Sequence, residues 1–265
     1  MTSTTSKTVA PIALPFRIKV CGITTIDDAV AAVDFGADAI GLNFSQSSPR
    51  QISIQRAAEI VSALGEHSKP ACTVGVFVEQ DINQANEVAQ RVGLDIIQLH
   101  GDHLPADAKK AQRPVLHVIR LRSGSLAKLQ SQLVDFGQQV MDFGQPVGGD
   151  WGGSLGVLVD AYVEGQFGGT GHRVAWAPLA DRWHWSEREP AAQQQRPAIS
   201  WPKQLPLVLA GGLNSENVQT AIVQAKPEAV DVASGVESAP GIKDHRLLER
   251  FLALAGLAMN DIRAR

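Results

Sequence analysis

The amino-acid sequence predicts a single α/β domain folded as a closed barrel of eight strand–helix units. Short runs of β-branched and apolar residues alternate eight times with segments of helical periodicity, a pattern typical of a parallel sheet covered by helices. The chain has 265 residues, 44% of them apolar, and barrels of this kind often reach such a length as one domain. The alternative is an open, doubly wound sheet, but no Gly-x-Gly-x-x-Gly turn follows the first strand.

The first four units are marked by strand breaks and by helix-capping residues. Gly22 breaks the first strand, Thr25 can accept backbone hydrogen bonds at the start of the next helix, and Gly36 stops that helix. The four strands are predicted at residues 17–21, 39–44, 73–78 and 95–99. The second and third helices are predicted to begin after Ser53 and Asp81, and a short helical stretch follows Pro105.

The last four units are less regular. Their strands are predicted at residues 115–120, 157–160, 207–210 and 229–233. Their helices are predicted to start at Ser125, after a cap at Asn214, and at about Asp244, the last one running to Leu257. Together the eight units predict an α/β fold of the (β/α)8, or TIM barrel, type.

Three stretches lie outside the repeat. Residues 137–156 are rich in glycine and residues 181–204 are rich in Trp, Gln and Pro. Both are insertions around strand six, and we interpret them as surface embellishments. Residues 1–15 are predicted to be a flexible N-terminal tail, and residues 16–265 the catalytic barrel domain.

The charge composition argues against nucleic acid and membrane partners. The chain carries 24 basic and 27 acidic residues, a formal net charge of −3. No apolar run approaches the roughly 20 residues needed to span a bilayer. Any anion site must therefore be local, built from backbone amides and a few side chains.

The cysteine and histidine content argues against a disulfide framework and against a metal site. The two cysteines, Cys21 and Cys72, have neither paired nor metal-ligand spacing, and the histidines show no ligand spacing either. A reducing, cytoplasmic location is therefore expected.

The carboxyl ends of the strands are where such a barrel holds its catalytic groups. Cys21 and Asp160 stand at two of these ends and can form a pair of base and acid. A lone cysteine is more often inert packing, and a thiol is a good proton acceptor only where cations or amide dipoles lower its pKa. The place of Cys21 before a glycine turn favours catalysis, whereas Cys72 opens its strand at the opposite end and is predicted to be structural.

Glycine-rich loops after strands six, seven and eight predict a phosphate site. Glycines let the backbone approach an anion, and helix N-termini present unpaired amides to it. Each loop alone is equally well explained as a turn, but three at these barrel positions indicate phosphate binding. The candidate residues are Gly169, Gly171, Gly211, Gly212, Ser234 and Gly235.

Two further side chains are candidates for contact with the substrate. Arg50, in the loop after strand two, can make a bidentate contact with a carboxylate, although a solvated loop arginine is the simpler interpretation. His100, at the end of strand four, can line the site or polarise a substrate group. A hydrogen-bonded structural histidine is an equally good interpretation of His100.

Strand alternation places two charged residues inside the barrel. Lys19 shares a face with Cys21, and Asp231 alternates with outward-facing valines. Strands one and eight are neighbours in a closed barrel, so we predict that Lys19 and Asp231 interact in the lumen. Their expected role is structural, because unpaired charges there are very costly.

Eight motifs occur in the order found in a known family. They are residues 19–24, 48–50, 74–78, 98–101, Asp160, 168–171, 209–213 and 231–237. On these motifs the sequence resembles the phosphoribosylanthranilate isomerase family of tryptophan biosynthesis, from about Arg17 to the last helix.

The resemblance implies an Amadori rearrangement of N-(5-phosphoribosyl)anthranilate without a cofactor. Asp160 would protonate the furanose ring oxygen, Cys21 would remove the proton from C2 of the sugar, and Arg50 would hold the anthranilate carboxylate. The loops after strands six to eight would hold the phosphate. The expected partner is this small phosphorylated substrate, and the protein is expected to be a monomer or a homodimer.

The sequence departs from the family in two respects and leaves two rival functions. The chain is longer than usual, and Ala233 stands where the family commonly has Ser.

One rival is another phosphosugar barrel, such as the histidine-pathway isomerase, which handles two phosphates and uses carboxylates as acid and base. The other rival is a non-catalytic barrel that has kept the fold.

Overall fold

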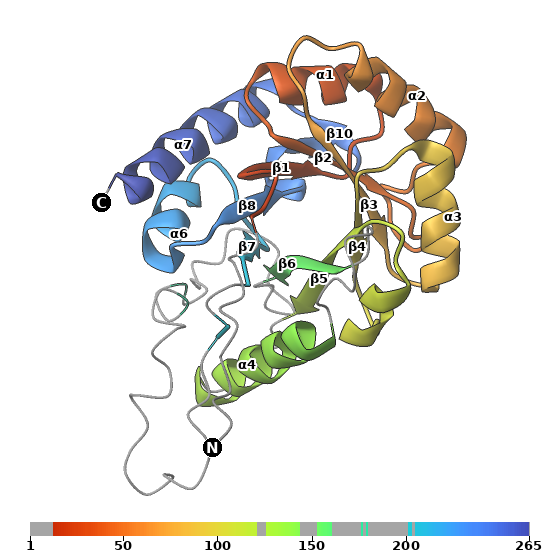
Figure 1. The fold of residues 1–265 in the computed structure, drawn as a ribbon. Helices are drawn as coiled ribbons and strands as arrows, with labels where there is room; N and C mark the ends of the chain where they lie inside the picture. The colour runs from red at the N-terminus through yellow and green to blue at the C-terminus, as the bar shows by residue number, and fades with distance from the viewer. Residues whose placement is uncertain are drawn as a thin grey trace, which may run out of the picture.

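The computed structural model describes residues 13–120, 126–143, 153–160, 176, 179, 201–202 and 205–264. Eight parallel strands pair in chain order, and the eighth returns to the first to close a barrel (Figure 1). The predicted (β/α)8 fold is confirmed, and the open sheet is excluded. The strands are β1 (Ile18–Cys21), β2 (Ala39–Asn43), β3 (Cys72–Phe77), β4 (Ile96–Leu99), β5 (Pro114–Arg120), β6 (Gly153–Asp160), β7 (Leu207–Ala210) and β8 (Ala229–Val232).

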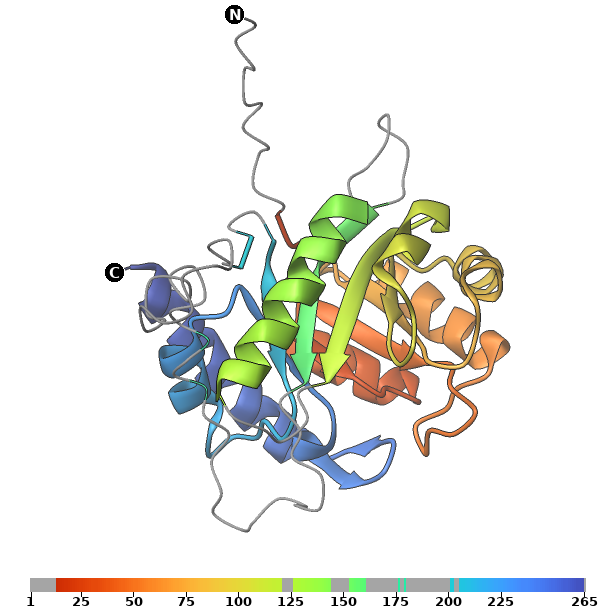
Figure 2. The same ribbon diagram turned by 90° about the horizontal axis from the view of Figure 1, so that it is seen from below.

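Helices surround the barrel on its outer side (Figure 1). They are α1 (Ile26–Asp34), α2 (Ile54–Gly65), α3 (Ile82–Val92), the 3₁₀ helix η1 (Pro105–Lys110), α4 (Leu126–Phe143), α6 (Val218–Ala225) and α7 (His245–Arg263). After β8 comes a short 3₁₀ helix, η4 (Ser234–Val236), and an antiparallel hairpin of β9 (Glu237–Ala239) and β10 (Ile242–Lys243). The hairpin lies at the end of the barrel toward which the strand arrows point (Figure 2).

The helix starts are set by the capping residues that the sequence predicts. The Thr25 and Ser53 hydroxyls accept from the backbone N–H of Asp28 and Arg56, each at 3.1 Å. Asp81 forms a complete capping box at the start of α3. Because a side-chain oxygen here satisfies an N–H that the helix itself cannot pair, it fixes where the helix begins.

Helix α6 begins later than the sequence predicts. Asn214 accepts from the backbone N–H of Glu216 and Asn217, at 2.9 and 3.2 Å. It therefore stabilises a turn rather than the helix start, and α6 opens at Val218. The prediction missed this because an asparagine favours both turns and helix caps.

The predicted insertion over residues 137–156 is wrong at both of its ends. Helix α4 continues to Phe143 and β6 begins at Gly153, four residues before the predicted Val157. The glycines here serve packing: a Cβ on Gly137 would lie 3.3 Å from the ring of Trp201, and one on Gly156 would lie 2.9 Å from the Pro206 carbonyl oxygen. Residues 144–152, the second insertion apart from residues 201–202, and residues 1–12 of the predicted tail lie outside the described residues.

The apolar core has two layers, as expected for strands that are covered on both faces. The outer layer fills the space between the strands and the helices. The inner layer fills the lumen, and it consists of Phe16, Ala39, Val74, Ile96, Leu116, Val118, Leu158, Val208, Ala210 and Ala229. At the carboxyl ends of the strands, Leu158 and Ala210 of this inner layer also line a cavity.

Carboxylates fix the starts of three strands at the end of the barrel opposite the hairpin. Asp38 accepts from the backbone N–H groups of Arg17 and Ile18, both at 2.9 Å. Asp95 accepts from Thr73 N–H at 2.8 Å, and Glu228 from Leu207 N–H at 2.7 Å. In each case the residue that precedes an even-numbered strand holds the start of the odd-numbered strand beside it.

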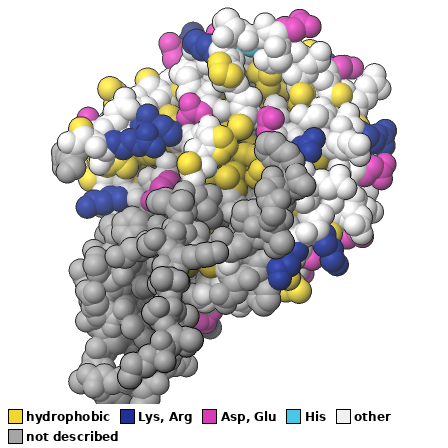
Figure 3. Space-filling model, in the orientation of Figure 1, with side chains coloured by type: hydrophobic (Ala, Val, Ile, Leu, Met, Phe, Trp, Pro, Cys, Tyr) yellow, Lys and Arg dark blue, Asp and Glu magenta, His cyan; other side chains and the backbone are white. Residues whose placement is uncertain are grey.

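Charged side chains of both signs are interspersed on the face shown in Figure 3. Among the helices that the structure describes, none is both long and apolar enough to cross a bilayer.

Candidate active site

A cavity of about 480 Å³ opens at the carboxyl ends of the strands. This volume suits a small organic ligand. Seven of the residues predicted from the sequence line it: Cys21, Arg50, His100, Asp160, Gly211, Gly212 and Ser234. Gly169 and Gly171, which were also predicted, lie outside the described residues.

Lys19 and Asp231 form an ion pair in the lumen, and Asp231 also lines this cavity. Their strands align the two residues directly, and Lys19 Nζ lies 2.8 Å from Asp231 Oδ1. Lys19 is fully buried. Burial alone would lower the pKa of Lys19, but the charge of Asp231 raises it above its usual value, so the ammonium stays charged. The predicted contact in the lumen is confirmed.

The thiol of Cys21 is buried beside this pair. Burial raises the pKa of Cys21, against the charges of Lys19 and Lys243, which lower it. A thiol that accepts a proton readily has a lowered pKa, and this geometry does not supply one because desolvation outweighs the two cations. The cations nevertheless favour the thiolate over what burial alone would allow.

Gly41 on β2 makes the room for Cys21 and Lys19. A Cβ at this position would lie 2.9 Å from Cys21 Sγ and 3.0 Å from Lys19 Nζ. Real Cβ contacts are rarely so short, so any larger residue would displace one of the two side chains.

Asp160 ends β6 on another part of the cavity wall. Its carboxylate is 19% exposed, and its Oδ2 lies 3.9 Å from Nε of Arg120, at the end of β5. Because Asp160 and Cys21 stand on strands that are not neighbours, a bound molecule can lie between them. This arrangement suits a general acid and a general base acting on one ligand.

Arg50 is held by a partner that the sequence analysis did not assign. Its Nε and Nη2 donate to the two carboxylate oxygens of Glu237, at 2.8 and 2.7 Å. Its Nη1 makes no hydrogen bond to the described part of the chain. Glu237 stands in one of the motifs that resemble the family, but nothing local in the sequence pairs it with a residue 187 positions away.

The loops after β7 and β8 present backbone to the cavity. Gly211 and Gly212 both adopt positive φ, at 86° and 66°, a conformation that few other residues adopt. Gly235 does not line the cavity, but a Cβ there would collide with the Leu213 carbonyl oxygen. Gly235 therefore lets the two loops approach one another, which brings Ser234 close to the β7 loop.

Strand β4 and the residue directly after it contribute two buried polar atoms without a partner in the described part of the chain. They are Oε1 of Gln98, a residue that is 3% exposed, and Nε2 of His100. Burial lowers the pKa of His100 to about 4, so its imidazole is neutral near pH 7. Both residues line the cavity, and a buried amide oxygen without a donor indicates a group supplied by a ligand. Gln98 begins the motif of residues 98–101, but it was not among the site residues predicted from the sequence.

The loop that carries Arg50 is fixed at its start by Glu79. The hydroxyls of Ser45 and Ser47 both donate to Glu79 Oε1 at 2.6 Å. These hydrogen bonds lower the pKa of Glu79 to about 2.

Among the residues that the structure describes, no three His, Cys, Asp or Glu side chains group closely enough to hold a metal ion.

The sequence matches one family over most of its length. Residues 18–253 match the family described as N-(5'phosphoribosyl)anthranilate (PRA) isomerase. The N-(5'-phosphoribosyl)anthranilate isomerase of Pseudomonas fluorescens (strain SBW25) is 38% identical over 236 residues, which cover 89% of this chain and 93% of that protein. The enzyme of the same name from Stutzerimonas stutzeri (strain A1501) is also 38% identical over 236 residues, with 89% and 95% covered.

Solved structures of the same kind of enzyme share the fold. The crystal structure of phosphoribosyl anthranilate isomerase from Thermotoga maritima has a TM-score of 0.69 at 29% identity, covering 91% of this chain and 98% of that chain. A complex of such an isomerase with reduced 1-(o-carboxyphenylamino)-1-deoxyribulose 5-phosphate has a TM-score of 0.65, also at 29% identity and with the same coverage.

Proposed function

The chain belongs to the N-(5'-phosphoribosyl)anthranilate isomerase family, and on that basis we propose which of its residues carry out the reaction. The protein is an isomerase of tryptophan biosynthesis that interconverts an aldose and a ketose. Its substrate is N-(5'-phosphoribosyl)anthranilate, and the product is 1-(o-carboxyphenylamino)-1-deoxyribulose 5-phosphate. The observation that carries our assignment of roles is that Cys21 and Asp160 line one cavity together with the loops after β7 and β8.

Asp160 is the proposed general acid. It donates a proton to the furanose ring oxygen, which opens the ring and leaves an iminium (Schiff-base) intermediate. Its position at the end of β6 supports this role because the carboxyl group faces the cavity and is still 19% exposed. A carboxyl group that is reached by solvent can be reprotonated between turnovers.

Cys21 is the proposed general base, which removes the proton from C2 of the iminium intermediate. The resulting enolamine tautomerises to the ketose. Lys19 and Lys243 support this role because their positive charges stabilise the thiolate, although burial opposes its formation. Transfer of the C2 proton returns the thiol to its neutral form, which burial favours.

We assign the two ends of the substrate to different groups on the cavity wall. We assign the phosphate to the backbone of Gly211, Gly212 and Ser234, with Gly235 shaping the loop. By resemblance to the family, Gly169 and Gly171 complete this site. We assign the anthranilate carboxylate to Arg50, and the middle of the substrate to the wall formed by Gln98 and His100.

Removing either reacting side chain tests the roles of acid and base. We expect Cys21→Ala and Asp160→Ala each to lower kcat by about 10²–10⁴-fold, the usual contribution of one general acid or base. KM should change little, because neither group anchors an end of the substrate. The reaction is followed as the loss of fluorescence of phosphoribosylanthranilate generated in situ.

The matched control is Cys72→Ala, which removes the other cysteine, at the start of β3. It should leave both kinetic constants unchanged. Full activity of Cys21→Ala or of Asp160→Ala would overturn the role of that residue. Absence of turnover by the wild type would contradict the assigned reaction itself.

Two rival functions were open from the sequence, and the family match favours neither. A histidine-pathway isomerase uses carboxylates as acid and base, whereas this cavity holds Cys21 in the place of one of them. A non-catalytic barrel gives no reason for an acid and a thiol in one cavity.

We also propose a cytosolic location, which agrees with two free cysteines. The state of monomer or homodimer, the tail over residues 1–15 and the barrel domain over residues 16–265 stay predictions.

A further inference from the structure

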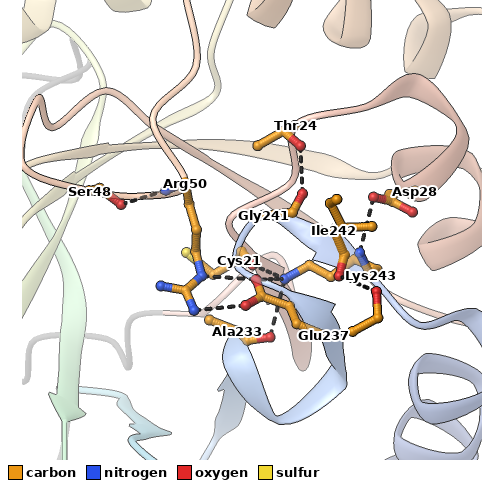
Figure 4. Close-up of polar contacts among 11 residues, drawn as sticks. Cys21, Thr24, Asp28, Ser48, Arg50, Ala233, Glu237, Gly241, Ile242 and Lys243 are labelled. Carbon is orange, nitrogen blue, oxygen red and sulfur yellow. Dashed lines mark hydrogen bonds and ion pairs between the residues drawn. The ribbon is translucent and has the colours of Figure 1, made fainter.

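Lys243, on the hairpin strand β10, is a buried cation whose part in the reaction described above is limited to the effect of its charge on Cys21. The residue is 4% exposed. Its Nζ donates to the Cys21 carbonyl at 2.7 Å, to Glu237 Oε1 at 2.8 Å and to the Ala233 carbonyl at 3.2 Å. Figure 4 shows the ammonium between the hairpin and the end of β1. One side chain thus joins the end of the strand that carries Cys21, the end of β8 and the hairpin.

Glu237 joins Lys243 to Arg50. Its Oε1 accepts from both Lys243 Nζ and Arg50 Nε, each at 2.8 Å, and its Oε2 accepts from Arg50 Nη2 at 2.7 Å. Burial alone would raise the pKa of Glu237, but the hydrogen bonds from Arg50 and Lys243 lower it, so the carboxylate stays ionised. The carboxylate is therefore shared by two cations from different parts of the chain (Figure 4).

The bidentate contact leaves the guanidinium of Arg50 with one orientation. Two parallel N–H···O bonds fix the plane of the group as well as its position. The stem of Arg50 lies against Gly22, where a Cβ would collide with its Cδ. The side chain is 22% exposed, and Nη1 is left to bind a ligand.

We propose that Glu237 and Lys243 are positioning residues for the isomerase reaction: Glu237 orients Arg50 for the substrate carboxylate, and Lys243 fixes both Glu237 and the end of β1 that carries Cys21. This inference rests on the proposed function, since it takes Arg50 as the carboxylate-binding group. Neither residue touches the reacting atoms. Each acts by holding a group that does, in the way that supporting hydrogen bonds hold an active-site side chain in place.

The hairpin itself is fixed to the same side of the barrel mouth. The Thr24 hydroxyl, just after β1, donates to the Gly241 carbonyl at 2.6 Å, and the Lys243 backbone N–H donates to Asp28 Oδ2 at 3.2 Å. The hairpin therefore cannot shift without breaking contacts to the loop after β1 and to α1. This rigidity is what a positioning role requires, because a mobile carboxylate would not orient a guanidinium.

The first test is Glu237→Gln, which keeps the size of the side chain and removes its charge. We expect KM for phosphoribosylanthranilate to rise about tenfold, with kcat within about threefold of the wild type, because the loss falls on substrate binding. In the Arg50→Met background the same change should alter KM by less than about twofold, because residues that act through one another are not additive.

Two matched controls separate positioning from general loss of stability. Glu228→Gln removes a carboxylate that holds the start of β7 at the opposite end of the barrel, and it should lower stability without raising KM. Lys69→Met removes an ammonium that donates to the Asp34 carbonyl at 2.9 Å, away from the cavity, and it should leave both constants unchanged.

The second test is Lys243→Met, which should raise KM and lower kcat together, since both Arg50 and Cys21 lose support. Alkylation of Cys21 by iodoacetamide, located by mass spectrometry, should also be slower, because one of the cations that favour the thiolate is gone. Unchanged kinetics in Lys243→Met would overturn the role of Lys243. If that variant does not fold, the cycle of Glu237→Gln with Arg50→Met still decides the role of Glu237.

An additive effect of Glu237→Gln in the Arg50→Met background, or an unchanged KM in Glu237→Gln, would overturn the inference while leaving the proposed function in place. An unchanged KM in Arg50→Met would instead contradict the proposed role of Arg50, and the inference with it. Wild-type turnover is measured in the same series, so failure of the assigned reaction is seen separately.

Discussion

At the scale of single residues, the side-chain oxygen of Gln98 gives the clearest indication of a bound ligand. Its amide oxygen is buried on the cavity wall and has no hydrogen-bond donor in the described part of the chain. A buried acceptor without a donor costs about 1–3 kcal/mol. The proposed substrate carries both N–H and O–H groups, so binding would relieve that cost.

Replacing Gln98 should therefore change protein stability and substrate binding in opposite directions. Gln98→Leu, which has a similar volume, should leave the stability of the ligand-free protein unchanged or raise it, because the unmet oxygen is removed. The same variant should raise KM about tenfold, as expected for the loss of one hydrogen bond of about 1–1.5 kcal/mol. Thermal unfolding and steady-state kinetics measure the two effects.

The control is Val76→Leu, a change at a neighbouring apolar position of the cavity wall that removes no polar atom. A KM for Gln98→Leu equal to that of the wild type would exclude Gln98 from the substrate contacts.

The residues of the candidate site divide by how local their signals are. Cys21 and Asp160 could be found from the sequence because strand ends can be predicted and the fold gathers strand ends at one mouth. Arg50 lies in the loop after β2, and its role was expected from the resemblance to the family. The partnership of Arg50 with Glu237 and the unmet oxygen of Gln98 could not be found, since both depend on contacts between distant elements. The sequence left the direction of the Cys21 pKa shift open, because a strand pattern shows neighbouring charges but not the degree of burial that raises this pKa.

At the scale of elements, β5, β6 and α4 meet around a buried histidine. His117 is 1% exposed, its Nε2 lies 2.8 Å from the Ser154 hydroxyl, and its ring makes an edge contact with Phe136 of α4. Burial lowers the pKa of His117 to about 4. The neutral imidazole is therefore the form that this packing accepts.

A dependence of stability on pH follows for this packing. The unfolded chain binds a proton at His117 below about pH 6.5, whereas the folded chain does so only below about pH 4. The contribution of neutral His117 to the free energy of unfolding is fully present above pH 6.5. It is lost progressively as the pH falls toward 4, and the loss reaches about 3 kcal/mol. Urea unfolding at a series of pH values measures this slope.

Two variants at this site separate the titration from the packing. His117→Gln should flatten the slope between pH 6.5 and 4, apart from the share due to His100. Ser154→Ala keeps the imidazole, so it should lower stability at every pH and keep the slope. Equal slopes in His117→Gln and the wild type would contradict the assignment.

The elements themselves were largely predictable, and the errors around β6 have one cause. Thr25, Ser53 and Asp81 act over three residues, so their capping role is visible in the sequence. Gly137 and Gly156 were interpreted as loop residues because glycine favours turns. In the fold, Gly137 lies inside helix α4 and makes room for Trp201, and Gly156 lies inside strand β6 and makes room for Pro206. Both partners come much later in the chain, so no local pattern shows these contacts.

At the scale of the whole molecule, the barrel is closed by the pairing of β1 with β8. The ion pair of Lys19 and Asp231 lies at this seam. Removing one member leaves a buried charge without a partner, which costs about 3–5 kcal/mol, whereas replacing both by apolar residues is often close to neutral.

We therefore expect Lys19→Met and Asp231→Leu each to lower the free energy of unfolding by about 3–5 kcal/mol. The double variant should lose less than either single one. Chemical denaturation of the three variants measures the coupling. Losses that add up in the double variant would show that the two charges are stabilised independently.

The pairing of β1 with β8 also determines when the barrel can close during synthesis of the chain. Lys19 and Asp231 are 212 positions apart, so on a ribosome that adds about 5–20 residues per second the partner of β1 arrives on the order of ten to forty seconds after β1 itself. Over that interval the nascent chain exposes the β1 edge, with unpaired N–H and C=O groups that another chain could pair with. Until the last strand and the hairpin have left the ribosome, Cys21 has neither Asp231 nor Lys243 nearby, so the newborn chain passes through a stage with an open edge and no activity.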